Sequence, residues 1–243
     1  MYREVPMYRD SISSAFYANA AFSATNVNKG QDHYSTFHGS IHRSHKFSHY
    51  QAYYGLNGGL GHYKVGAISQ ANPDSTGTLS LRYYNRALND SLISANSGYK
   101  MFGSYSAVGG INFVHPWPHG EWRVLGVGLA LNKEFGKYLE FRNKLPDTAA
   151  NLIDRNKTTL TICLSTDFVA KTRQGSSGYQ FAYIFNPKRL PGFDAARYAK
   201  SYQSAYMTHT LHINVQKVTG YFQLSMGTFS TGIQLGANYR LGK

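Results

Sequence analysis

The amino-acid sequence predicts an all-β protein, a closed antiparallel up-and-down transmembrane β-barrel of about ten strands, with eight or twelve strands as alternatives. Short segments in which apolar and polar side chains alternate strictly recur along the whole chain. The connections between these segments also alternate between short and long. A run of about 18 apolar residues, which a transmembrane helix requires, does not occur, whereas a barrel strand needs only about 9–11 residues.

The composition is basic and rich in glycine and aromatic residues. Among 243 residues there are 24 Gly, 20 Tyr and 14 Phe, and the formal net charge is +13. The single cysteine, Cys163, excludes a disulfide framework and a cysteine-based metal site. Since no linker divides the chain into halves, we expect one large β domain.

The segment with the clearest alternation is the last one, residues 232–241. Ile233, Leu235 and Leu241 share one face of an extended strand, and Gln234 and Arg240 share the other. Nine further segments repeat this pattern, so the last one is expected to close a barrel by pairing with the first. The ten predicted strands are residues 14–25, 34–43, 48–65, 99–114, 121–133, 158–168, 178–185, 207–217, 221–227 and 232–241.

Glycine recurs on the polar face of several strands, most densely within residues 48–65. Glycine weakens an ordinary soluble strand, because it packs nothing and costs conformational entropy. A narrow barrel tolerates it, since small inward residues leave space for large side chains on neighbouring strands.

The connections follow a rhythm with one exception. The second, fourth, sixth and eighth are short, the third, fifth and seventh are long, and the first is intermediate. We expect a helical turn near residues 147–153 in the fifth and a short helix at 194–202 in the seventh. The ninth connection, residues 228–231, is short where the rhythm calls for a long one.

Aromatic residues gather near the predicted strand ends, where interfacial girdles form in membrane barrels. With the alternation and the loop rhythm, this makes the sequence similar to bacterial outer-membrane β-barrel proteins over roughly residues 13–241. The resemblance implies an outer-membrane location after removal of a signal peptide, with residues 1–12 as a periplasmic segment and 13–243 as the barrel. The aromatic residues concerned are Phe47, Tyr50, Tyr63, Tyr99, Phe113, Trp117, Trp122, Phe135, Phe168, Tyr179, Phe185, Tyr206, Phe229 and Tyr239.

Four aspartates are each followed by Ser or Thr and then a small or apolar residue: Asp10, Asp74, Asp90 and Asp147. These motifs resemble the O-glycosylation signal of Bacteroidota, which makes a Bacteroidota-like origin our expectation. The same dipeptides are ordinary turn formers, and both interpretations stay open.

Polar and large side chains on the inward faces are expected to fill most of a ten-stranded lumen, so diffusion of large solutes is not expected. The residues expected to line the lumen are Tyr53, Asn57, Arg123, Asn132, Asp167, His212, Gln234, Asn238 and Arg240.

Two constellations invite a chemical interpretation. Ser165, Asp167 and His212 could form a hydrolase triad, but any polar lumen contains such residues and neither strand carries a family motif. Six histidines crowd the amino-terminal third, where lumen filling is a better account than metal binding. We therefore predict no enzyme activity, no catalytic residues, no metal and no cofactor. The histidines are His33, His38, His42, His45, His49 and His62.

Basic residues concentrate in two long connections, where they would meet lipopolysaccharide phosphates or an acidic partner. Nucleic acid is not an expected partner, because the aromatic residues lie on the apolar faces and not among these cations. We expect a non-catalytic binding or accessory subunit of an outer-membrane complex that contacts outer-membrane lipid, lipopolysaccharide and other envelope proteins. The alternatives are a narrow channel or porin, and a lipid-modifying hydrolase. The loop residues expected to bind are Lys137, Arg142, Lys144, Arg155, Lys188, Arg189, Arg197 and Lys200.

Overall fold

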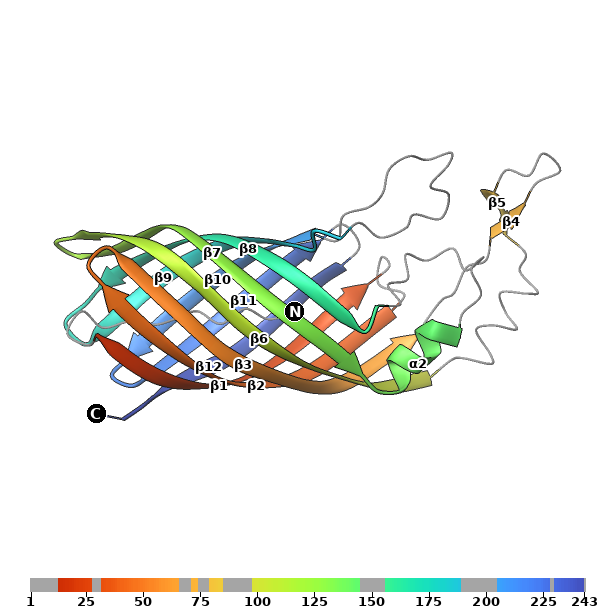
Figure 1. Cartoon of the computed structure of the whole chain (residues 1–243), viewed down its shortest axis with the longest axis horizontal. Helices are drawn as coiled ribbons and strands as arrows, with labels where there is room; N and C mark the ends of the chain where they lie inside the picture. Colours follow the sequence, from red (N-terminus) through yellow and green to blue (C-terminus); the bar gives the residue numbers. More distant parts are fainter. Residues whose placement is uncertain are drawn as a thin grey trace.

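Ten strands form one closed antiparallel barrel, which confirms the predicted fold class and strand number (Figure 1). The computed structural model describes residues 13–27, 32–65, 71–73, 79–84, 98–144, 156–188, 205–227 and 230–242. Around the barrel the strands follow the order β1-β12-β11-β10-β9-β8-β7-β6-β3-β2. They are β1 Ser14–Val27, β2 Asp32–Phe47, β3 Tyr50–Val65, β6 Gly98–Trp117, β7 Gly120–Phe135, β8 Thr158–Lys171, β9 Gly175–Phe185, β10 Ala205–Val215, β11 Val218–Gly227 and β12 Ser230–Leu241.

The first and last strands close the ring, as predicted. β1 pairs with β12 antiparallel from Phe16 opposite Leu241 to Val27 opposite Ser230. Because no strand of the ring keeps a free edge, the backbone N–H and C=O groups of the barrel pair with one another. A protein in a bilayer needs this pairing, since the hydrocarbon core holds no water to hydrogen-bond them.

Most strands extend a few residues beyond the predicted segments. Two predicted strands wrongly included residues that lie in a turn. β3 begins at Tyr50, since Ser48 stands in the turn with a φ of 51°. β10 ends at Val215, and Gln216 has a φ of 56°. A positive φ at the first turn residue belongs to the hairpin turns whose twist matches that of paired strands.

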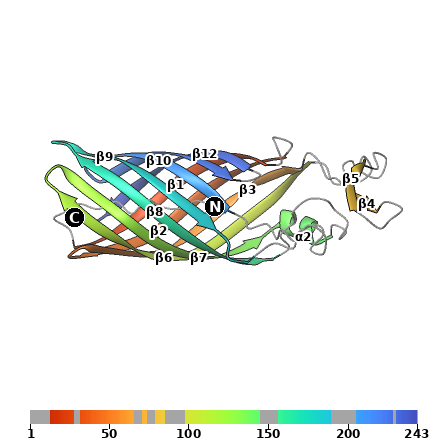
Figure 2. The same cartoon turned by 90° about the horizontal axis from the view of Figure 1, so that it is seen from above.

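The two ends of the barrel differ. Tight connections at residues 48–49, 118–119, 172–174 and 216–217 lie at one end, which we call the turn end. The opposite end, where the other ends of these strands and the helix α2, Lys137–Lys144, lie, is called the loop end (Figure 2). β11 ends at Gly227 and β12 begins at Ser230, so the ninth connection is short, as the sequence indicates.

α2 begins after Gly136, whose φ is 105°, and buries Leu139 and Phe141 while it contacts β6 and β7. The helical segments expected at residues 147–153 and 194–202 lie outside the described residues, as do residues 1–12 and all four Asp-Ser/Thr motifs. β4, Ala71–Pro73, and β5, Leu79–Tyr84, pair as a separate sheet that the sequence did not predict. Among the described residues, no helix has both the length and the hydrophobicity to cross a bilayer.

Apolar side chains cover the outside of the barrel and polar ones fill the inside. Leu56 is 69% exposed, whereas Ser44 and Thr210 are fully buried. This arrangement suits a protein whose outer wall is solvated by lipid. Other large outward side chains with at least half of their surface exposed include Phe22, Phe37, Ile41, Tyr54, Leu60, Leu125, Leu129, Leu131, Leu211, Ile213 and Leu235.

The aromatic girdle is present but smaller than predicted. Phe47, Tyr50, Trp122 and others near the turn end are exposed on the outer wall. Tyr63 and Tyr206, which the sequence assigned to the girdle, instead line the interior. The assignment is wrong because nearness to a strand end says nothing about which face a ring occupies.

Candidate functional site

The barrel interior divides into two halves. In the turn-end half, buried side chains from all ten strands form a packed polar cluster that we call the turn-end network. In the loop-end half there is a cavity, which we call the loop-end cavity. The network comprises the buried residues Tyr17, Asn19, His42, Ser44, Gln51, Tyr53, Asn112, Glu121, Arg123, Asp167, Gln180, His212, Tyr221, Asn238 and Arg240, together with Lys46, whose side chain is 20% exposed.

Inward glycines make room for the largest side chains of the network. A Cβ on Gly110 would lie 2.5 Å from the Tyr53 hydroxyl, and one on Gly236 would lie 2.2 Å from the Tyr221 hydroxyl. In each pair the glycine stands opposite the large residue on the adjacent strand. The expected alternation of small and large inward residues is therefore confirmed, and it lets the rings lie across the lumen.

A β-bulge at Val124 places Arg123 inside the barrel. Arg123 lies opposite Asp167 and Gly126 opposite Ser165, so β7 has one more residue than β8 in this interval. Strict alternation would put Arg123 and Gly126 on opposite faces, and the extra residue brings both inward. The sequence analysis placed Arg123 in the lumen without recognising the bulge that puts it there.

Arg123, Asp167 and His212 form the charged centre of the network. Arg123 Nη1 donates to Asp167 Oδ2, and His212 Nε2 donates to Asp167 Oδ1 at 3.1 Å. All three residues are at most 2% exposed. Charges buried to this degree need partners, and this pairing supplies them.

Further contacts tie strands that are not neighbours, which closes the lumen at this level. Lys46 on β2 donates to Glu121 on β7 at 3.1 Å. Asn19 on β1 donates to the Tyr221 hydroxyl on β11 at 3.1 Å, across the intervening strand β12.

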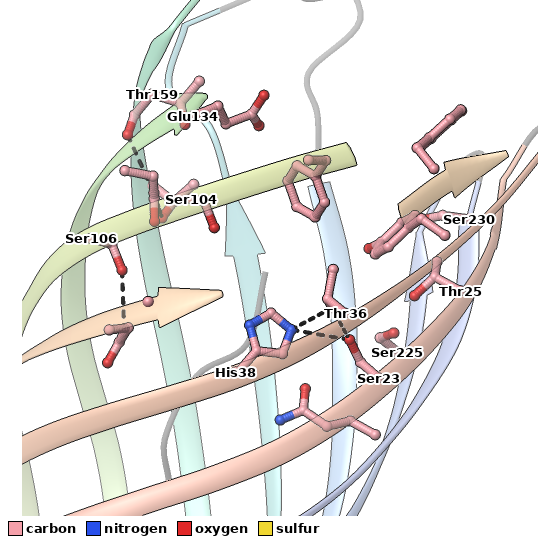
Figure 3. A pocket seen from close by; sticks show the side chains of 18 of the residues that line it. Ser23, Thr25, Thr36, His38, Ser104, Ser106, Glu134, Thr159, Ser225 and Ser230 are labelled. Carbon is pink, nitrogen blue, oxygen red and sulfur yellow. Dashed lines mark hydrogen bonds between the residues drawn. The ribbon is translucent and has the colours of Figure 1, made fainter. Parts of the chain in front are cut away.

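The loop-end cavity has a volume of about 370 Å³, and the side chains around it are mainly hydroxyls, amides and tyrosines (Figure 3). His38, Thr36 and Ser23 project into it from one wall, while Ser104 and Ser106 approach from another. Its lining consists of Ser23, Thr25, Tyr34, Thr36, His38, Gly39, Ser40, Asn57, Gly58, Tyr63, Phe102, Ser104, Ser106, Asn132, Glu134, Tyr138, Arg142, Thr159, Thr161, Asn186, Tyr206, Gln223, Ser225, Ser230, Ile233 and Gln234.

Short hydrogen bonds hold the cavity walls in place. Ser23 and Thr36 share a hydrogen bond of 2.6 Å, and both hydroxyls reach His38 Nε2, at 3.1 and 2.6 Å (Figure 3). On another wall, Asn57 Nδ2 donates to Ser106 Oγ at 3.2 Å. These bonds orient the side chains and leave each hydroxyl further hydrogen-bonding capacity toward the cavity.

An aromatic cluster stands at the loop end of the cavity. Tyr138 of α2 stacks on Tyr63 with ring centroids 3.9 Å apart, and Phe102 meets Tyr138 edge-on at 6.5 Å. Tyr34 lies parallel to Tyr63 at 6.3 Å. Stacked and edge-on rings of this kind stabilise their mutual packing, so α2 is anchored over the cavity wall.

Glu134 and Arg142 are the charged residues among the described cavity lining, and they form an ion pair with each other. Arg142 also lies over the Tyr138 ring, 4.9 Å from its centroid. It was expected as a binding residue of a loop, and the structure places it in the cavity wall, where it pairs with Glu134 at the end of β7.

The nine residues expected in the lumen have interior positions in two groups. Asn57, Asn132 and Gln234 line the cavity. The other six, Tyr53, Arg123, Asp167, His212, Asn238 and Arg240, are at most 8% exposed within the network.

The basic loop residues are only partly described. Lys137 and Lys144 are exposed on α2, and Lys188 donates to Asn156 Oδ1 at 2.9 Å. Arg155, Arg189, Arg197 and Lys200 lie outside the described residues.

The possible triad has a different geometry from that of a hydrolase. His212 directs Nε2 to Asp167, the second oxygen of that carboxylate meets Arg123, and no hydrogen bond joins Ser165 to His212 among the described residues. A triad needs a histidine that bridges the acid and the serine. The absence of catalysis stays a prediction.

Two of the crowded histidines lie in the interior: His38 lines the cavity and His42 belongs to the network. His42 stacks on the Tyr17 ring at 4.9 Å, which agrees with lumen filling. Within the described part of the chain, no three His, Cys, Asp or Glu side chains gather as a metal cluster. The absence of metal and cofactor likewise stays a prediction.

The cavity lining is what the sequence analysis mostly missed. Thr36, His38 and Ser40 alternate on β2, and Ser104 and Ser106 do so on β6. A search for alternating hydroxyls on the polar faces would have found this lining. Tyr138 left no such signal, because its position depends on the placement of α2.

No protein-family model matches the sequence, and no curated protein does. Several solved structures share the barrel architecture. The translocator domain of the autotransporter NalP from Neisseria meningitidis is 8% identical over 96% of this chain and 90% of that chain, with a TM-score of 0.43. The β-domain of the Bordetella autotransporter BrkA is 11% identical over 94% and 99%, also with a TM-score of 0.43. An outer-membrane channel from Pseudomonas putida F1 is 8% identical over 99% and 100%, with a TM-score of 0.44. Likeness at this level concerns architecture alone.

The closed ring, the apolar outer wall and the polar interior define the class of protein. The chain is a β-barrel of the outer-membrane type, and the outer membrane is its location, because a closed ring with an apolar outer wall and a polar interior is built to span a bilayer. The Bacteroidota-like origin stays a prediction.

Proposed function

We propose that this barrel is a non-catalytic binding protein of the outer membrane whose ligand site is the loop-end cavity. The observation that carries the proposal is the division of the lumen. The turn-end half is closed by side chains such as His212, Gln51 and Asn238, each about 1% exposed. A cavity of about 370 Å³ remains in the other half, a size at the low end of ligand pockets, which span roughly 300–1,000 Å³.

Planar-bilayer recording tests this proposal against the narrow channel. We expect no stepwise conductance from the purified barrel, and no change when Arg123 or Arg240 is neutralised. A channel that crosses the lumen must displace the Arg123–Asp167–His212 centre, whose charges are buried and paired. Reproducible conductance steps that depend on Arg123 would overturn the binding proposal in favour of the channel.

We further propose that the exposed cations of the loop end, including Lys137 and Lys144, bind lipopolysaccharide or an acidic partner in an envelope complex. Extraction in mild detergent and mass spectrometry of the co-purifying material test this part. A barrel that elutes alone from native membranes would contradict the accessory role. The hydrolase alternative predicts lost lipid turnover on Ser165→Ala or His212→Ala, and unchanged turnover would exclude that set.

A further inference from the structure

We infer that the loop-end cavity takes a small neutral polyhydroxylated ligand, a mono- or disaccharide. The inference rests on the proposed binding function and adds the chemical class of the ligand. Three properties of the cavity carry it: its charge balance, its hydrogen-bonding groups and its aromatic wall.

The charge balance disfavours an ionic ligand. Glu134 and Arg142 neutralise each other, and the other described lining residues are hydroxyls, amides, tyrosines, a histidine and apolar groups. An ion that enters such a cavity loses hydration without meeting an unmatched opposite charge. A neutral polar molecule avoids that cost.

The hydrogen-bonding groups suit a ligand with many hydroxyls. Ser and Thr side chains both donate and accept, and Asn and Gln side chains carry a donor and an acceptor at one end. A sugar hydroxyl has the same dual capacity, so it can pair with any of them.

The aromatic wall supplies the apolar surface that a sugar ring also needs. A pyranose has a face of C–H groups besides its hydroxyl edge, and that face packs against aromatic rings. Tyr63 lines the cavity under the Tyr138 stack, with Tyr34 and Phe102 beside it. Rings at the loop end and hydroxyls further inside thus line one space that fits about one or two sugar rings.

Isothermal titration of the purified full-length barrel in detergent tests the inference. The probes are maltose, cellobiose, lactose and N,N′-diacetylchitobiose at millimolar concentration, with digalacturonate and spermidine as charged comparisons. We expect saturable binding of at least one neutral disaccharide and weaker or no binding of the charged probes. Binding by none of the neutral sugars, or equal binding of charged and neutral probes, would overturn the inference.

Two variants locate the binding. Ser106→Trp fills the cavity and should weaken binding at least about tenfold, whereas Ala107→Trp, one residue away on the outer face of β6, should leave it unchanged. Ser104→Ala removes one hydroxyl of the cavity wall, so it should keep the fold intact and weaken binding by about 3- to 10-fold. Equal affinity in wild type, Ser106→Trp and Ser104→Ala would place any sugar elsewhere and overturn the inference.

Failure here is distinguishable from failure of the proposed function. A barrel without conductance that binds only digalacturonate or spermidine keeps the binding function and overturns the neutral-sugar class. A barrel that conducts overturns the binding function itself.

Discussion

Gly236 on β12 leaves the space that the Tyr221 ring occupies in the turn-end network. A Cβ at this position would lie 2.2 Å from the Tyr221 hydroxyl oxygen, 2.4 Å from its Cζ and 2.8 Å from the Cβ of Ala21. Ordinary van der Waals contact begins near 3.4 Å, so in Gly236→Ala the ring must move by about 1 Å.

The energetic consequence follows from what the Tyr221 hydroxyl binds. It accepts hydrogen bonds from Asn19 and Gln234, both 3.1 Å long. Overpacking costs about 1–3 kcal/mol, and each weakened hydrogen bond adds roughly 0.5–1.5 kcal/mol. We therefore expect Gly236→Ala to lower the free energy of unfolding by about 2–6 kcal/mol.

Gly220→Ala is the matched control. Gly220 lies on the outer face of β11, and a Cβ there meets nothing within 4 Å. Because alanine lowers the conformational entropy of the unfolded chain, Gly220→Ala should stabilise the barrel by about 0.4–1 kcal/mol. Urea titration of folding into detergent micelles measures both variants. Equal stability of the two variants would refute the claim that inward glycines accommodate the network rings.

Three further predictions concern other parts of the barrel. Asp167→Asn keeps the side-chain shape but leaves Arg123 buried without its counter-charge, so urea titration should show a free energy of unfolding that is lower by about 3–5 kcal/mol. A decrease below about 1 kcal/mol would contradict the buried ion pair. Leu129→Arg, in the middle of the outer face of β7, should lower the free energy of unfolding by about 2–4 kcal/mol, measured by refolding into liposomes. Val218→Arg, at the start of β11, should lower it by about 0–1 kcal/mol. Equal losses in the two variants would contradict a lipid-facing belt on the outer wall. Tyr138→Ala removes the stack that anchors α2, so amide exchange in α2 should accelerate while the barrel strands stay protected, and unchanged exchange would contradict that anchoring role.

The barrel could be predicted from the sequence because its information is local and repeated. A period of two residues assigns inside and outside on every strand, and the outer face of residues 232–241 is as apolar as expected. Closure was expected because ten segments share this alternation and none should keep a free edge in a bilayer, and the pairing of β1 with β12 agrees with it.

The features that could not be predicted from the sequence depend on a single inserted residue and on where side chains and α2 lie in the folded barrel. The bulge at Val124 adds one residue to β7, and strict alternation read through it would turn Arg123 outward. Tyr63 was assigned to the lipid girdle, because nearness to a strand end does not distinguish a ring in the membrane interface from one in the cavity wall. α2, Lys137–Lys144, was not predicted, and the helical turn expected at residues 147–153 lies outside the described residues.

Side chains seal one half of the lumen, while the other half holds an accessible cavity. Maleimide labelling of single-cysteine variants in detergent, with Cys163 replaced by Ser, tests this division most directly. Ser106→Cys lies in the cavity and should react readily. Ser44→Cys lies in the network, where Ser44 is fully buried and accepts a hydrogen bond from Gln51 at 2.9 Å, and it should stay unmodified until the barrel is unfolded. Equally fast labelling of both cysteines in the folded protein would contradict the sealed half and favour an open channel.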